Sequence, residues 1–263
     1  MALSWGAKRQ MFYFGIVFLA VVIAILILIW PMLNREPTCF DGKMNGAESG
    51  LDCGGGCAKV CTPEALQLVT LWARAFKVVD GKYNLMAYVE NQNRESGIPL
   101  MSYEFKVYDE NNIFIGRQSG STFVTSNDRT AIFEAGIETG NRVPERVSFE
   151  FTSVPTWIKI NRDQKNALAV SADDKVLSNP LSTPKLEAYI VNKTLNEIKD
   201  LDVFAVLYDE AGNVITVSKT LIELLPKNDK VPVVFTWPEP LSARPTRIDI
   251  FPQVNVFELN IVK

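Results

Sequence analysis

The stretch LDVFAVLYD, residues 201–209, is followed directly by the string EAGN at residues 210–213. Two sets of side chains alternate along it: Leu201, Val203, Ala205 and Leu207 in one set, and Asp202, Phe204, Val206 and Tyr208 in the other. A period of two residues is typical of a β-strand with one buried face, and Asp, Gly and Asn favour a turn after it. The stretch therefore predicts a half-buried strand that ends at a tight turn.

The same pattern occurs twice in the chain, at an offset of 100 or 101 residues. The matched segments are AYVENQN (87–93) and AYIVNKT (188–194), FKVYDENN (105–112) and AVLYDEAGN (205–213), SNDRTAIF (126–133) and KNDKVPVVF (227–235), and PERVSF (144–149) and PTRIDI (245–250). Short alternating segments separated by turn signals are typical of antiparallel sandwiches. The sequence thus predicts an all-β fold of two tandem immunoglobulin-like sandwiches, whose last strand is VFELNIVK at residues 256–263.

These segments carry a resemblance to a known family. The chain resembles the F-x-L-Y-D signature of FxLYD-type β-sandwich domains of bacterial and archaeal envelope proteins, at Phe105, Val107, Tyr108 and Asp109 and again at Leu207, Tyr208 and Asp209. The second copy departs from the pattern at Ala205, and Asn91 and Asn192 match an Asn that the family places before its second strand. The resemblance implies a structural or interaction module without known chemistry, in which the tyrosines are packed residues.

The N-terminal part contains a long apolar segment, residues 11–33, without a charged residue. About 20 apolar residues suffice to cross a bilayer as a helix, and a cleaved signal peptide has a shorter core and a small-residue cleavage site. Lys8 and Arg9 precede the segment, whereas Arg35 beyond it is followed at once by Glu36. We therefore expect an uncleaved single-pass signal-anchor with the N-terminus in the cytoplasm and the remainder outside it.

The charge balance argues against nucleic acid as a partner. Without Lys8 and Arg9, 25 of the 27 basic residues remain against 30 acidic residues, a net charge of −5. Such a surface has no general attraction for nucleic acid or anionic lipid. The sequence predicts the membrane, through one helix, and an unidentified envelope or protein component as partners.

All four cysteines lie in CFDGKMNGAESGLDCGGGCAKVC, residues 39–61: Cys39, Cys53, Cys57 and Cys61. Outside the cytoplasm thiols persist as disulfides, and an even number of cysteines fits two bridges with three possible pairings. A zinc site of four thiolates usually has two close pairs, whereas here the spacing is C-x13-C-x3-C-x3-C. We expect two disulfides and leave their pairing open.

The same segment has the spacing of a calcium loop. With Asp41 at position 1 of twelve, the oxygen-bearing residues at positions 1, 5, 7, 9 and 12 are Asp41, Asn45, Ala47 (through its carbonyl), Ser49 and Asp52. Lys43 at position 3 departs from that pattern, and Asp-Gly and Asn-Gly are also ordinary turn formers. Calcium binding and a plain turn remain as the two interpretations. The string resembles short C-x-D-G-x-x-N-G-x-E-x-G-x-D-C-G-G-x-C repeats of bacterial secreted and surface proteins, which implies an extracytoplasmic module.

These features predict five parts: residues 1–10 as a cytoplasmic N-terminus, 11–33 as the membrane helix, 34–62 as a Cys-rich knot, and 63–162 and 163–263 as the two sandwiches. The chain has no histidine, which excludes His-dependent nucleophile arrangements and His-ligated metals, and no nucleotide-binding glycine motif. No cofactor other than calcium is indicated.

The sequence predicts a non-catalytic, membrane-anchored extracytoplasmic module that presents the two sandwiches as a rigid rod for adhesion, interaction or structure. The alternative is an accessory subunit of a larger envelope membrane complex for assembly, secretion or a surface layer. An envelope hydrolase would need a polar cleft, and no motif in the sequence indicates one.

Overall fold

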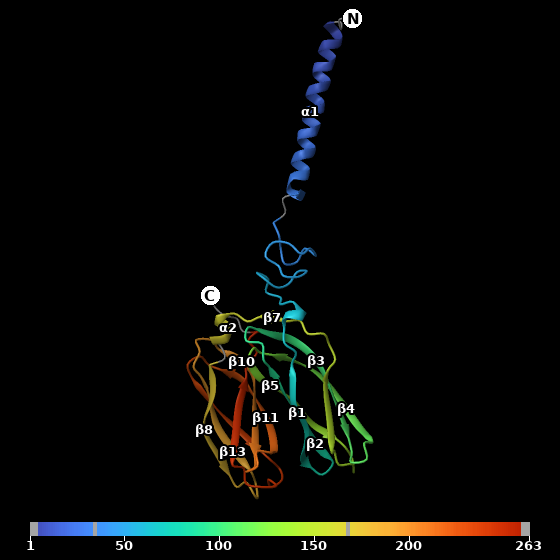
Figure 1. The fold of residues 1–263 in the computed structure, drawn as a ribbon. Coiled ribbons are helices and arrows are strands. Elements are labelled where there is room, and N and C mark those ends of the chain that lie inside the picture. The colour runs from blue at the N-terminus through green and yellow to red at the C-terminus, as the bar shows by residue number, and fades with distance from the viewer. Residues whose placement is uncertain (1–4, 34–35, 167–168, 259–263) are drawn as a thin grey trace. The chain divides into compact units, whose positions relative to one another are not determined.

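A computed structural model describes residues 5–33, 36–166 and 169–258, and the chain divides into two compact units, Met1–Cys57 and Ala58–Lys263 (Figure 1). The first unit begins with α1 (Trp5–Leu33). Its segment Arg9–Trp30 has 22 residues and a mean hydropathy of 3.2, so it is long and apolar enough to cross a membrane. The predicted N-terminal apolar helix is confirmed.

The first half of the second unit contains two antiparallel sheets. One has the order β1 (Val69–Val79), β2 (Lys82–Asn91), β5 (Asp128–Glu138); the other has β4 (Phe114–Val124), β3 (Ser96–Tyr108), β6 (Arg146–Phe151), with β7 (Ile158–Lys159) paired to β3. Leu85, Val89 and Ile132 of the first sheet pack against Phe105 and Val107 of the second in one buried cluster. The two sheets therefore form a sandwich, which we call repeat 1.

The second half has the same strand order at the same offset. One sheet has the order β12 (Lys230–Thr236), β9 (Lys185–Asn192), β8 (Val170–Ser178), and the other has β11 (Val214–Leu225), β10 (Ile198–Tyr208), β13 (Arg247–Gln253). Leu186, Ile190 and Phe235 of the first sheet pack against Val203 and Leu207 of the second. We call this sandwich repeat 2. The expected all-β architecture of antiparallel sandwiches with one N-terminal helix is confirmed.

Short helical segments connect these parts. The 3-10 helix η1 (Thr62–Glu64) precedes β1, and α2 (Arg162–Asn166) lies between the two repeats. Residues 58–60 also belong to the second unit: the backbone N–H of Val60 donates to the carbonyl of Trp157 at 2.9 Å, and that of Lys159 donates to Ala58 at 2.8 Å. The segment that follows Cys57 is thus fixed to β7 by main-chain hydrogen bonds.

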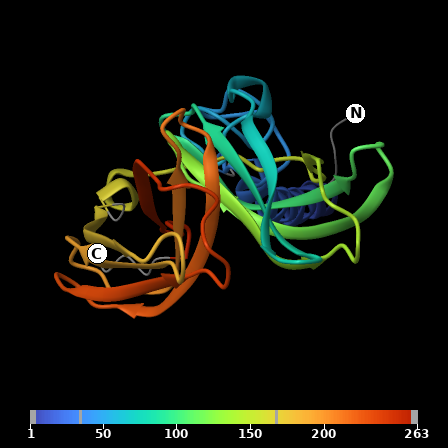
Figure 2. The ribbon, with the colours of Figure 1, turned by 90° about the horizontal axis from the view of Figure 1, so that it is seen from below.

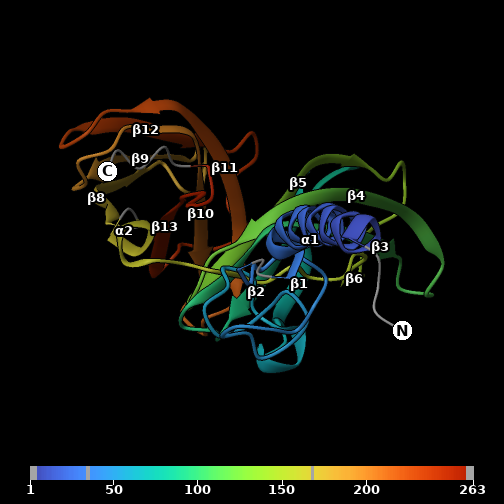
Figure 3. The same ribbon diagram turned by 90° about the horizontal axis from the view of Figure 1, so that it is seen from above.

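The two repeats lie side by side (Figures 2 and 3), and a buried cluster joins the outer faces of two of their sheets. Phe76, Met86 and Ala131 of the β1-β2-β5 sheet contact Phe204, Val206, Tyr208 and Val217 of the β11-β10-β13 sheet. The aromatic rings of Phe133 and Phe204 are 6.3 Å apart, and those of Tyr88 and Phe251 are 5.6 Å apart. Aromatic pairs at such separations add to the stabilisation from buried area.

This contact corrects one prediction. Strand β10 is not half-buried, because Phe204 is 2% exposed and packs against repeat 1 on the face opposite the core of repeat 2. The physical reason is that Phe204 and Val206 are apolar on the outward side of β10, so a second surface must cover them. The two sandwiches meet through broad sheet faces, and their presentation as a rigid rod stays a prediction.

The polarity of equivalent positions explains which faces are covered. In the central strand of the uncovered β4-β3-β6 sheet, Glu104 and Lys106 occupy the positions of Phe204 and Val206. Lys106 pairs with Glu104 at 3.1 Å and also with Glu150, which opposes Glu104 in the register. Charged pairs keep this face hydrated, whereas the equivalent face of repeat 2 is apolar and buried.

The end of the chain differs from the prediction. Residues 256–258 form a turn rather than the start of a strand, and β13 ends at Gln253. Val254 and Val256 are buried against the core of repeat 2, so the apolar pattern reflects packing of a turn. The rest of the predicted strand, residues 259–263, lies outside the described residues.

Candidate functional site

The Cys-rich segment is oxidised. Cys39 and Cys57 form a disulfide with an S–S distance of 2.02 Å, and Cys53 and Cys61 are also disulfide-bonded. The predicted disulfides are confirmed, and the four thiolates of a zinc site are not available. The Cys39–Cys57 bond closes a loop of 18 residues in sequence separation, which removes conformational freedom from the unfolded segment.

The carboxylates proposed as calcium ligands cap turns of this loop. Oδ1 of Asp52 accepts the backbone N–H groups of Asp41 and Gly42, both at 3.1 Å. Asp41 accepts the N–H of Lys43 at 2.9 Å and the side-chain amide of Asn45 at 2.9 Å. The amide of Asn45 holds the pKa of Asp41 below its usual value. These bonds account for the two acids as turn formers, and the calcium interpretation stays a prediction.

The other proposed ligands are placed as follows. The carbonyl of Ala47 accepts the backbone N–H of Gly56 at 3.3 Å, and the N–H of Ser49 donates to the carbonyl of Cys53 at 3.2 Å. Oδ1 of Asn45 is buried and has no hydrogen-bond partner. Asp41, Asn45 and Asp52 thus belong to one hydrogen-bond network at the start of the loop. The carbonyl of Ala47 is used in a main-chain hydrogen bond within the loop.

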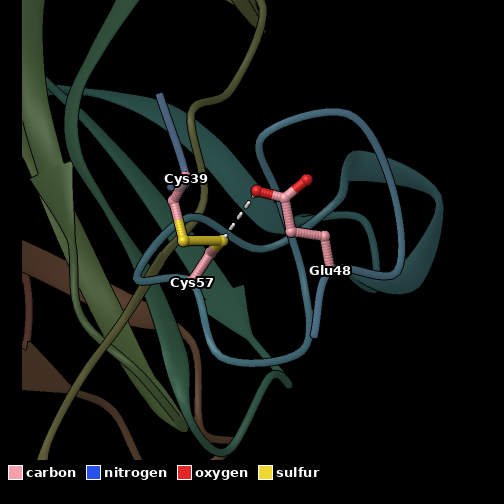
Figure 4. A group of neighbouring side chains, drawn as sticks. All are labelled: Cys39, Glu48 and Cys57. Atoms are coloured by element: carbon pink, nitrogen blue, oxygen red, sulfur yellow. Dashed lines mark hydrogen bonds between the residues drawn. A yellow bond between two sulfur atoms is a disulfide. The ribbon is translucent and has the colours of Figure 1, made fainter. Parts of the chain in front are cut away.

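Glu48 lies beside the disulfide (Figure 4). Its Oε1 is 3.5 Å from Sγ of Cys57, and its Oε2 accepts the backbone N–H of Asn45 at 3.3 Å. Cys39, Glu48 and Cys57 are the one group of metal-type ligand atoms within mutual reach among the described residues. Because the two sulfurs are bonded to each other, they are not thiolates, and the group does not form a metal centre.

A close backbone approach explains one glycine of the segment. Gly55 has a φ of +51°, and a Cβ there would lie 1.5 Å from the carbonyl oxygen of Ala47. Both the dihedral angle and the contact exclude a larger side chain at this position. The glycine run after Cys53 thus allows the loop to fold back on itself.

The two Tyr-Asp signatures form equivalent turns. Oδ1 of Asp109 accepts the N–H of Ile113 at 2.8 Å, and Oδ1 of Asp209 accepts the N–H of Asn213 at 2.7 Å. The bond from the Asn213 backbone lowers the pKa of Asp209, with a further contribution from the Asn213 side chain. These aspartates fix turns and do not converge on a shared cleft.

The signature tyrosines carry stacked arginines. The guanidinium of Arg146 lies 4.0 Å from the ring centroid of Tyr108, and that of Arg247 lies 3.7 Å from the ring of Tyr208. Such stacking on an aromatic face is a favourable cation–π contact. Phe105, Val107 and Leu207 point into the sandwich cores and are 0% exposed. All of these residues hold the fold together.

Asn91 and Asn192 are buried, and each acts as a clamp: its side-chain amide holds backbone carbonyls of two different segments together. The side-chain amide of Asn91 donates to the carbonyls of Ser96 at 2.9 Å and Thr125 at 2.7 Å. The amide of Asn192 donates in the same way to Asn196 at 2.9 Å and Pro226 at 3.0 Å. Asn192 begins the string Asn-Lys-Thr, which has the pattern of a glycosylation sequon. Because Asn192 is 1% exposed, this sequon is not accessible for glycosylation in the folded chain.

Next to each clamp lies an equivalent hollow. Asn127 and Asn228 both adopt positive φ, 49° and 50°, and the aspartate that follows each accepts the next backbone N–H at 2.7 Å. The hollow of repeat 1 measures ≈ 380 Å³ and includes Asp128 and Arg129; that of repeat 2 measures ≈ 370 Å³ and includes Asp229 and Lys230. The matched segments of the sequence thus form matched concave surfaces.

The hollow of repeat 1 adjoins a second cavity. This cavity of ≈ 340 Å³ shares Asp128 and Arg129 and is lined by both repeats: Tyr88, Thr125, Asp128 and Arg129 of repeat 1, and Val170–Ala172 and Ile250–Val254 of repeat 2. We call the two adjoining cavities the inter-repeat groove. Burial raises the pKa of Asp128, although its side chain reaches solvent, and burial raises the pKa of Tyr88 to about 12.

Sequence reasoning missed the groove, although two of its residues, Asp128 and Arg129, lie in a segment that the repeat alignment had matched. The sequence feature that could have indicated it is Asn-Asp followed by a basic residue, which occurs once in each repeat.

Comparisons with known proteins give no family. No protein-family profile matches the chain, and no curated protein matches it. A crystal structure of red sea bream transglutaminase has a TM-score of 0.24 and 10% identity over 73% of this chain and 30% of that chain. A β-glucuronidase from glycoside hydrolase family 2 has a TM-score of 0.20 and 10% identity over 60% of this chain and 20% of that chain. The chain spans less than a third of either protein, and such scores carry no argument about function.

Proposed function

We propose that the protein is a membrane-anchored, extracytoplasmic interaction module without catalytic activity. The apolar helix serves as a single-pass anchor, with Lys8 and Arg9 on the cytoplasmic side. The oxidised Cys-rich segment supports this orientation, because disulfides persist outside the cytoplasm. The two β repeats then face the envelope or the exterior.

The observation that carries the proposal is the buried contact between the repeats. It joins two sandwiches into one compact unit and fixes loops, strand edges and a groove from both repeats in a constant arrangement. A rigid scaffold that presents loops and edges is the usual basis of recognition by β-sandwiches. The described acidic side chains mostly cap turns or form surface ion pairs, a pattern that serves presentation rather than chemistry.

The resemblance to FxLYD-type immunoglobulin-like domains and to Cys-rich surface repeats supports the same function. In this proposal the Cys-rich segment is a protease-resistant collar between anchor and sandwiches. Its loop is closed by the Cys39–Cys57 disulfide and by the Asp52 cap.

Site-specific photo-crosslinking in the native membrane tests this function. A photoreactive residue would be placed, one at a time, at the exposed positions Gln92, Ser119, Lys193 and Thr236 of the full chain. The proposal expects at least one position to give a discrete adduct with another envelope component, while the others serve as controls. Absence of adducts at all four positions, with correct membrane insertion, would contradict an interaction module.

A further inference from the structure

The inter-repeat groove combines an open strand edge with the carboxylate of Asp128, in a lining that also contains Glu90, Arg94 and Arg129. Its cavities of ≈ 380 Å³ and ≈ 340 Å³ adjoin each other, because Asp128 and Arg129 line both. Ligand sites occur preferentially where two domains meet, because neither domain alone closes such a space. The groove has walls from both repeats, as has a smaller cavity of ≈ 200 Å³ that includes Lys77 and Trp237 in its lining.

One wall is the edge of a sheet. β8 is an outer strand in the order β12-β9-β8, so one side of its backbone has no strand partner, and its residues Val170–Ala172 line the groove. β13 is also an outer strand, but Pro252 removes a backbone donor from its part of the wall. An unpaired strand edge accepts an added strand through main-chain hydrogen bonds. The edge of β8 therefore offers a backbone-pairing surface within the groove.

The opposite wall carries an acid without a cationic partner. The guanidinium of Arg129 is committed to Glu90, with Nε 3.3 Å from its Oε1. Asp128 accepts the backbone N–H of Arg129 at 2.7 Å, and none of the ion pairs among the described residues includes its carboxylate. A partly desolvated carboxylate favours a cation beside it. The site would therefore take a ligand with a positive group at this point.

We propose that the inter-repeat groove binds an extended peptide segment of a protein partner, paired with the edge of β8 and directing a lysine or arginine side chain to Asp128. This inference rests on the proposed interaction function and names the class of partner. Main-chain pairing supplies affinity that does not depend on sequence, and the side chain that meets Asp128 supplies selectivity.

Repeat 2 provides a matched control. Asp229 occupies the position of Asp128, with the same hydrogen bond to the next residue and a hollow of nearly the same size. The residues that line this hollow all come from repeat 2, and none belongs to β8 or β13. Asp229 therefore has the charge of the proposed site without the edge of β8, because the strand residues of its hollow belong to β9 and β12.

A peptide titration of the full chain in detergent micelles tests the proposal. The probe is a fluorescent six-residue peptide of alternating threonine and lysine, with a glutamate-for-lysine peptide as its comparison. We expect saturable binding of the lysine peptide, about tenfold weaker binding after Asp128→Asn, and unchanged binding after Asp229→Asn. Equal effects of the two substitutions, or preference for the glutamate peptide, would overturn it. An unchanged unfolding midpoint verifies that each variant is folded.

Photo-crosslinking separates this inference from the function on which it rests. Gln92 lines the groove, whereas Lys193 lies at the equivalent position of repeat 2 and Ser119 on the uncovered sheet of repeat 1. A partner adduct at Gln92 that Asp128→Asn removes supports the groove. Adducts at Ser119 or Lys193 but not at Gln92 would overturn the groove and leave the interaction function intact. No adduct at any position would contradict the function itself.

Discussion

Truncation of Phe204 to alanine tests whether the two repeats form one unit. Phe204 is 2% exposed and lies on the outward face of β10, where it contacts repeat 1. Its ring stacks on Phe251 with centroids 5.5 Å apart and meets the edge of Phe133 at 6.3 Å. The substitution removes the aromatic centre of the contact and leaves the core of repeat 2 unchanged.

The expected loss of stability is large. Truncation of a fully buried Phe costs about 3–5 kcal/mol, through lost burial and the cavity that remains. For a domain of this size, that corresponds to a decrease in the unfolding midpoint on the order of 10 °C. The matched control is Glu104→Ala at the equivalent position of repeat 1. Because Glu104 forms surface ion pairs with Lys106 at 3.1 Å and Arg117 at 3.7 Å, we expect a cost of about 1 kcal/mol or less.

Denaturant unfolding of the full chain in micelles, followed by tryptophan fluorescence, measures both effects. Trp72 packs against the contact and reports its opening. The wild-type protein should lose both repeats in one transition, and Phe204→Ala should lower its midpoint or divide it into two steps. If Phe204→Ala costs no more than Glu104→Ala, the two faces are not joined, and the account of the fold is wrong.

Three further predictions concern single residues. Asn192→Ala removes a buried amide that donates to several loop carbonyls, so the free energy of unfolding should decrease by about 2–4 kcal/mol in denaturant titration; a change below about 1 kcal/mol would contradict its role as a clamp. Gly55→Ala places a methyl group against the Ala47 carbonyl, and peptide mapping under non-reducing conditions should show scrambled disulfides; native pairing would refute the contact. Burial raises the pKa of Tyr88 to about 12, so its contribution to stability is complete below pH 10 and is lost as the pH rises from 10 through about 12. Compared with wild type, Tyr88→Phe should flatten this alkaline loss in unfolding curves measured between pH 9 and 12, and equal slopes would argue against burial.

The strand pattern was predictable from the sequence, but its second buried face was not. The inward set of β10, including Val203 and Leu207, packs into the core of repeat 2 as expected. The outward set could be recognised as buried only by comparing the two repeats. Phe204 and Val206 are apolar, whereas the equivalent residues of repeat 1 are the charged Glu104 and Lys106. Period alone cannot distinguish a solvent face from one that a second domain covers.

The candidate sites show the same limit. The spacing of the cysteines indicated disulfides but not their pairing. The pairing depends on the path of the loop, which includes the close approach of the Gly55 backbone to the carbonyl of Ala47. The groove requires that β8 lies close to Asp128. The two are more than forty residues apart in sequence, and the contact between the repeats brings them together. Local patterns do not encode such an approach.

The redox state of the cysteines in the native membrane reports on which side of the membrane the two repeats lie. Cells would be lysed with an alkylating reagent present, and the intact mass and the non-reduced peptides of the chain measured. With the repeats outside the cytoplasm, we expect no alkylated cysteine, a mass four hydrogens below the reduced chain, and a linked peptide pair that contains Cys39 and Cys57. Four alkylated thiols would contradict it, since the Cys-rich segment and the sandwiches would then lie in the reducing cytoplasm.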